Sequence, residues 1–90
     1  MKLKLTIETW AKGPWYIAKC PELDFVSQGH SPEEAKGNLL EVIGIQFEEM
    51  NELGTLNEYL EESGYKLENG NAIPMTEMIG FQKQAIEIGA

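Results

Sequence analysis

The strongest pattern of apolar and polar positions in the chain is a helical one between residues 32 and 53. Apolar side chains recur there every three or four positions, along one side of an α-helix; they are Ala35, Leu39, Val42, Ile43, Phe47, Met50 and Leu53. Ser31 is a suitable N-cap, Pro32 fits the first helical position, and Glu34 can complete a capping box. Gly54 follows where a left-handed C-cap would end the helix. The pattern therefore predicts one long helix on which a sheet packs.

Three shorter segments before this helix have the character of β-strands. Residues 2–9 alternate between apolar and polar side chains, and residues 15–19 are rich in aromatic and β-branched side chains. The turn signal at residues 12–14, Lys-Gly-Pro, predicts that these two strands form a hairpin. A third strand is expected at residues 24–28, directly before the helix.

The remainder of the chain predicts one more helix and one more strand. Residues 55–63 are expected to form a short second helix, which Thr55 can cap. Residues 66–75 have the loosest composition, and Asn69-Gly70-Asn71 within them is expected to be a turn or a mobile loop. Residues 80–90 alternate again and predict a last strand.

Two glycines inside the long helix, Gly37 and Gly44, lie seven residues apart and so fall on nearly one face. Each costs about 1 kcal/mol relative to alanine. Either another backbone approaches the helix at this face, from a strand or a second subunit, or the apolar stripe holds the helix in spite of them.

The sheet and the helix together predict a core in which six apolar side chains are almost fully buried: Leu5, Ile7, Leu39, Ile43, Phe47 and Met50.

Composition narrows the classes of function. The 90 residues are 42% hydrophobic and carry 15 acidic and 7 basic side chains, for a net charge of −8. Such a chain is a poor direct ligand for nucleic-acid phosphates, whereas a basic protein partner matches its charge; the charge also serves simple solubility. One cysteine excludes an intramolecular disulfide, and with no signal-like start a cytoplasmic setting is expected. No apolar run is long enough to cross a membrane.

Residue types that carry catalysis are sparse. Glu8, Glu22 and Asp24 are expected at strand ends and could meet around a metal ion, but they are three acids among fifteen and read equally well as solvated charge. His30 is expected to be an exposed turn residue, and Cys20 a structural thiol. The glycines match no phosphate-binding loop. No catalytic residue, metal or cofactor is therefore predicted.

Two tryptophans flank the first predicted turn. Trp10 shares the parity of the polar face of its strand, and Trp15 opens the next strand. An exposed tryptophan is a typical anchor of a protein interface. The alternative is a side chain that folds over the end of the hairpin and caps the core.

Residues 15–43 resemble the HicB-like antitoxins, and the resemblance extends over residues 1–53 and about 73–90. The matching features are Tyr16 and Ala18, Pro21-Glu22-Leu23, Val26-Ser27-Gln28-Gly29, the capped start Ser31 to Ala35, Asn38 and Leu39, and Ile73-Pro74. The resemblance implies an α+β fold class, in which an antiparallel β-β-β-α-β sheet with a partial ribonuclease-H-like order carries one long helix on one face. The pattern adds the short second helix to this, within a single domain of residues 1–90.

The chain departs from the family in several places. Asp24-Phe25 stand where the family usually has Pro-Gly, and His30 replaces an acid before the helix. Residues 55–71 look like an insertion. The sequence to Ala90 leaves no room for the C-terminal DNA-binding module of many members, so operator binding by this chain alone is not expected.

The resemblance implies a non-catalytic antitoxin that neutralises a small basic HicA-like ribonuclease by covering its RNA-binding or active surface. Candidate partner-binding residues are Trp10, Trp15, Glu22 and Asp24. The alternatives are a stand-alone dimeric regulatory domain and a metal-dependent nuclease that uses Glu8, Glu22 and Asp24.

A homodimer is expected, because association buries apolar area that so small a domain exposes. The predicted last strand has apolar residues on both faces, with Phe81 and Ala85 opposite Ile86 and Ile88. Phe81 and Ala85 are the candidate dimer interface. The competing arrangement is a monomer in which residues 55–71 fold back over that face.

Overall fold

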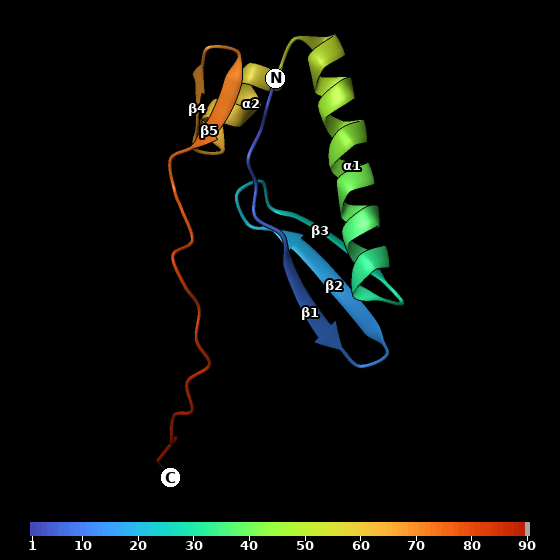
Figure 1. Cartoon of the computed structure of the whole chain (residues 1–90), viewed down its shortest axis with the longest axis vertical. Helices are drawn as coiled ribbons and strands as arrows, with labels where there is room; N and C mark the ends of the chain where they lie inside the picture. The colour runs from blue at the N-terminus through green and yellow to red at the C-terminus, as the bar shows by residue number, and fades with distance from the viewer. Residues whose placement is uncertain (90) are drawn as a thin grey trace.

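A computed structural model describes residues 1–89 as two small antiparallel sheets and two helices (Figure 1). The elements are β1 (Glu8–Lys12), β2 (Trp15–Cys20), β3 (Phe25–Gly29), α1 (Pro32–Leu53), α2 (Leu56–Glu62), β4 (Tyr65–Glu68) and β5 (Asn71–Pro74). The strands β1, β2 and β3 pair in that order, and α1 lies along this sheet (Figure 1). The expected α+β class is confirmed, with its three-stranded antiparallel sheet, long helix and short second helix.

The ends of α1 are set by the residues that the sequence marks. The Ser31 hydroxyl oxygen accepts a hydrogen bond from the backbone N–H of Glu34 at 3.0 Å, and Pro32 opens the helix. At the other end Gly54 adopts φ 73°, a left-handed conformation that glycine enters without steric strain. Its N–H and that of Thr55 donate to carbonyls of the last helical turn. Both predicted caps are confirmed.

Small side chains hold the sheet close to the first half of α1. Ala18 and Cys20 of β2 are fully buried, as are Ala35 and Leu39 of α1. Together with partners from α2 and the second sheet they form one buried cluster: Ala18, Cys20, Leu23, Ala35, Leu39, Ile43, Leu60, Tyr65 and Ala72. Because Ala18 and Ala35 carry only a methyl group, the helix backbone can approach the strands closely at these positions.

The second half of α1 extends beyond the sheet, so the predicted core included helix residues that have no strand opposite them. A helix of 22 residues is about 33 Å long, whereas strands of five or six residues span about 17–20 Å. Phe47 instead packs against Tyr59 of α2, edge to face with ring centroids 6.3 Å apart. Phe47 and Met50 are therefore only half-buried, and so are Leu5 and Ile7 of the N-terminal segment, which were also expected in the core. Val42 and Leu53 of the stripe are exposed.

The predicted first strand, residues 2–9, is displaced. Pairing with β2 begins only at Glu8, and the preceding segment forms a single parallel bridge between Leu3 and Ala72. The backbone N–H of Thr6 donates to the carboxylate of Glu22 instead of to a strand, which explains the difference. The alternation still indicated correctly which side chains face inward, because Leu3, Leu5 and Ile7 pack against the core.

The turn predicted at Asn69-Gly70-Asn71 is present at Asn69-Gly70, but the residues on either side of it form the β4–β5 hairpin, which was not predicted. Its two-residue turn is Asn69-Gly70, with φ values of 51° and 76°. Two positive φ values are typical of the type I′ turn that Asn-Gly favours, so the sequence held the signal. At α2, Thr55 does not cap with its side chain; its hydroxyl donates to the Met50 carbonyl at 3.4 Å.

The predicted last strand is also wrong for the residues that the structure describes; Ala90 lies outside them. Residues 75–89, which we call the arm, form no helix or strand and extend away from the rest of the chain (Figure 1). Alternating residues become a strand only beside an edge that accepts their hydrogen bonds. Within residues 1–89, neither sheet pairs with residues 80–89.

The helical and turn glycines differ in what surrounds them. A Cβ atom on Gly29 would lie 2.7 Å from the backbone nitrogen of Ala35, whereas one on Gly37 or Gly44 would meet nothing within 4 Å. Only Gly29 thus allows the close approach of helix and strand, and no part of the described chain approaches the helical pair.

We predict opposite effects for two glycine-to-alanine changes. Gly29→Ala should lower the free energy of unfolding by about 1–3 kcal/mol, because the backbone of α1 must shift to admit a methyl group. Gly37→Ala, in open space on the same helix, should raise it by about 0.5–1 kcal/mol. Urea denaturation followed by circular dichroism measures both. A neutral Gly29→Ala would contradict the close contact.

Candidate functional site

One face of the three-stranded sheet packs against α1. Within residues 1–89, no helix covers the other face. Residues directly opposite each other on paired strands share a face. The register places Trp10 opposite Ile17, and Ile17 opposite Gln28. Ala18 and Cys20, one position out of phase, are buried on the α1 side. The uncovered side, which we call the open face, consists of Glu8, Trp10, Lys12, Trp15, Ile17, Lys19, Val26 and Gln28.

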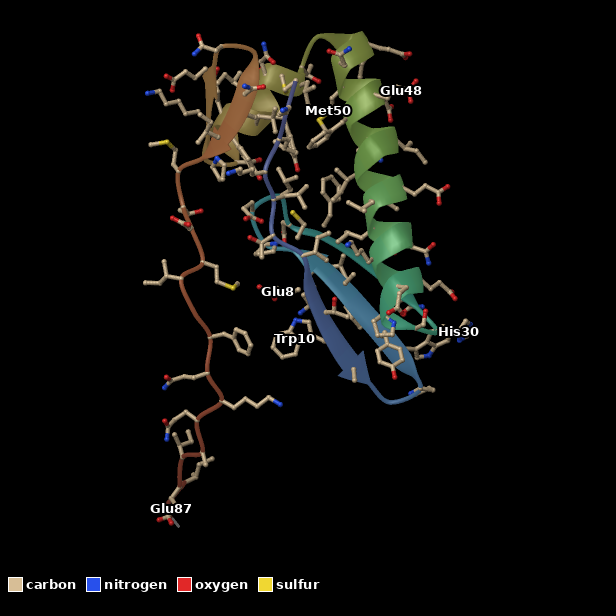
Figure 2. The ribbon with its side chains drawn as sticks, viewed as in Figure 1. Glu8, Trp10, His30, Glu48, Met50 and Glu87 are labelled. Carbon is tan, nitrogen blue, oxygen red and sulfur yellow. The ribbon has the colours of Figure 1, made fainter. Side chains whose placement is uncertain are left out.

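Trp10 stands on the open face with its ring held in place. Its side chain is 53% exposed and projects from β1 on the side away from α1 (Figure 2). The indole N–H donates to a carboxylate oxygen of Glu8 at 3.1 Å, and the ammonium of Lys19 lies 5.7 Å from the ring centroid. These contacts orient the ring without burying it. Of the two arrangements the sequence left open, the structure has the exposed one.

Trp15 is the second large aromatic side chain on this face. It is 38% exposed, and its ring lies against His30, with centroids 4.5 Å apart and a tilt of 33°. Val26 on β3 is 55% exposed. The sequence analysis treated His30 only as an exposed turn residue and missed this contact. The position of His30, immediately after the third strand, was the available signal. The open face therefore presents two tryptophans and a valine to solvent.

The other two predicted partner-binding residues lie elsewhere. The Glu22 carboxylate accepts two hydrogen bonds from the Thr6 backbone N–H, at 2.9 and 3.1 Å, and one from the Thr6 hydroxyl at 2.6 Å. Asp24 is exposed in the turn before β3, with φ 58°. The structure thus brings Trp10 and Trp15 to one face and leaves Glu22 with a structural contact.

Hydrogen bonding dominates the ionisation of Glu22. Burial alone would raise the pKa of its carboxyl, but the hydrogen bonds from the Thr6 hydroxyl and N–H outweigh burial and lower the pKa below 4.5. Because these bonds join the N-terminal segment to the turn after β2, the charged form of Glu22 stabilises the fold.

The acids of the nuclease alternative are not brought together. Glu8 is engaged by Trp10 and Glu22 by Thr6, and Asp24 stands in its turn. Within residues 1–89, no three His, Cys, Asp or Glu side chains are grouped as metal ligands.

Other buried titratable groups have structural contacts. Burial raises the pKa of the Cys20 thiol, and it raises that of Tyr65 to about 12. The Tyr65 hydroxyl donates to the Lys4 carbonyl at 2.7 Å, and the Tyr59 hydroxyl donates to the Leu23 carbonyl at 3.1 Å. These bonds tie the second sheet to the N-terminal segment and α2 to the turn after β2.

Charge is divided between the two layers. The helix α1 carries six glutamates and one lysine, Lys36, and all seven side chains are exposed; the acids are Glu33, Glu34, Glu41, Glu48, Glu49 and Glu52. Glu48 points away from the sheet (Figure 2). The open face instead holds Lys12 and Lys19 with Glu8. The acidity therefore lies mainly on the helical layer.

Comparison with protein-family models, with curated proteins and with solved structures gives no match for this chain. Among the described residues, no helix has the length and apolar character needed to cross a bilayer.

We predict that Glu22→Gln destabilises the protein in a pH-dependent way. The folded-state pKa lies below 4.5, so the stabilisation is present above about pH 4.5 and is lost as the pH falls through the folded value. The variant should therefore melt below the wild type at pH 7, and the gap should narrow near pH 3. Thermal melts at both pH values measure this, with the exposed Glu41→Gln as control. An equal gap at both pH values would contradict a charge-dependent role.

Proposed function

We propose that the protein is a HicB-like antitoxin-type binding protein, which neutralises a small basic HicA-like ribonuclease by covering its RNA-binding surface. The observation that carries the proposal is the pair of exposed tryptophans on the open face. Hot spots of protein interfaces are enriched in tryptophan, and strands hold such anchors more rigidly than loops do. The motifs at residues 15–43 support the family assignment.

The aromatic rings of the open face, rather than its charge, suit a cationic partner surface, because the face itself carries Lys12 and Lys19 against Glu8. A ribonuclease binds RNA phosphates with arginine and lysine side chains, and such cations stack favourably on tryptophan. Trp10 already accepts Lys19 in this geometry at 5.7 Å, beside the carboxylate of Glu8. An arginine that replaces Lys19 over this ring would gain the same contact.

The net charge of −8 supplies the long-range part of the recognition. An acidic protein attracts a basic partner and repels RNA, so the same field favours the toxin over its substrate. Complementary charge accelerates association, and the acceleration weakens as salt screens it. The protein then works in the cytoplasm as a homodimer, without binding nucleic acid itself and without catalysis.

We predict that this chain inhibits the RNA cleavage by the small basic protein encoded in the adjacent reading frame, in stoichiometric amounts. Trp10→Ala should weaken the inhibition about 30-fold or more, because a central anchor contributes about 2 kcal/mol or more. Cleavage of labelled RNA at increasing inhibitor concentration measures this. Ile45→Ala, an exposed apolar side chain on α1, is the matched control and should inhibit normally.

Two results would contradict the proposal. One is an adjacent protein that neither cleaves RNA nor binds this chain. The other is cleavage of RNA or of an RNA–DNA hybrid by this chain alone with magnesium or manganese, abolished in Glu8→Gln, which would favour the nuclease alternative.

A further inference from the structure

The arm presents apolar side chains that nothing within residues 1–89 covers. Ile79 is 96% exposed and Phe81 89%, and Ile86 and Ile88 are similarly open. The Met75 N–H donates to the Gly64 carbonyl, and beyond it no hydrogen bond among the described residues joins the arm to the rest. The radius of gyration is 15.9 Å, whereas a compact chain of this length has about 12 Å. The arm thus exposes apolar side chains that no described part of the chain packs against.

The three-stranded sheet has a free edge at β1, where one further strand could pair. β1 pairs only with β2, so the backbone N–H and C=O groups on its other side are without a strand partner in the described chain. The opposite edge is partly occupied, because the Asn38 amide donates to the Gln28 carbonyl of β3 at 2.9 Å. A free strand edge is a template for one further strand.

Within one chain, the residues just before the arm already pair in parallel with the N-terminal segment. The parallel bridge joins Leu3 to Ala72, and the Ala72 N–H donates to the Lys2 carbonyl at 2.9 Å. The structure records this offset of 69 residues only within one chain; carried over to a second copy's arm along β1, it would put Ile79 beside Trp10 and Phe81 beside Lys12. Neighbours across paired strands share a face, so both arm side chains would lie on the open face.

The arm of the same molecule does not take this place. A groove of about 400 Å³ separates its base from the N-terminal segment, with Leu5, Thr6 and Glu22 among the residues on one side and Pro74, Thr76 and Met78 on the other. A second copy can supply the strand through reciprocal exchange, which closes with two-fold symmetry.

We infer that the arm of a second copy pairs along the free edge of β1 and adds Ile79 and Phe81 to the open face, so that the binding face is complete only in the homodimer. The pairing stands on the arm and the edge alone, whereas its part in toxin binding rests on the proposed function.

Light scattering at tens of micromolar tests the assembly. The full chain should have the mass of a dimer, and Phe81→Glu should have that of a monomer with an unchanged circular dichroism spectrum of the body. Ile45→Glu makes the same change at an exposed position of α1 and should remain a dimer. A monomeric wild type, or a Phe81→Glu variant that stays dimeric, would overturn the inference.

Cross-linking tests the register and shows which chain donates the arm. Ala11→Cys and Gly80→Cys, placed on differently tagged chains and mixed, should form a disulfide between chains, because the offset puts these positions side by side. Cys20 is buried and stays in place. Gly44→Cys, on the exposed side of α1, replaces Ala11→Cys in the control and should give no such product. A bond that forms only within a chain carrying both cysteines would overturn the exchange.

The two proposals fail separately. A cross-linked dimer that does not inhibit the basic partner would sink the proposed function and leave the arm pairing supported. A monomeric Phe81→Glu that inhibits as well as the wild type would support the pairing but overturn the claim that the arm completes the binding face.

Discussion

The close contact between the first half of α1 and the sheet determines the rest of the structure. Gly29 leaves room for the backbone of Ala35, and Ala18 and Ala35 are fully buried in the same cluster. Because the covered face takes the small residues, the strand register turns Trp10 and its neighbours to the other side. The feature that makes the helix pack is therefore also the feature that exposes the aromatic face.

Much of this could be predicted from the sequence, because the signals are local. The caps of α1 and the first hairpin depend on a few adjacent residues and were found. The first strand and the arm were misjudged for one reason, since alternation reports which way side chains face but not whether a strand lies alongside. Glu22 was taken for a binding residue because its bond to Thr6 spans 16 residues and has no local signature. The stacking of Trp15 on His30 was missed because it joins residues far apart in sequence.

The charge distribution and the apolar surfaces have separate roles. The glutamates of α1 give the molecule a negative field that acts at a distance, while the contacts that would hold a partner are aromatic and apolar and lie on the opposite layer. The arm carries two acids and one base in residues 75–89, so it is a nearly neutral segment of a strongly acidic chain. Two copies that repel through their helices can therefore still associate through their arms.

Amide hydrogen exchange at two protein concentrations tests most directly whether the arm completes the open face in a dimer. Amides of residues 77–81 and those on the outer edge of β1 should be protected together in the concentrated protein, because they would share hydrogen bonds. Both sets should lose that protection on dilution, while the amides of α1 keep theirs. Arm amides that exchange at the rate of an unstructured peptide at every concentration would contradict the exchange of arms.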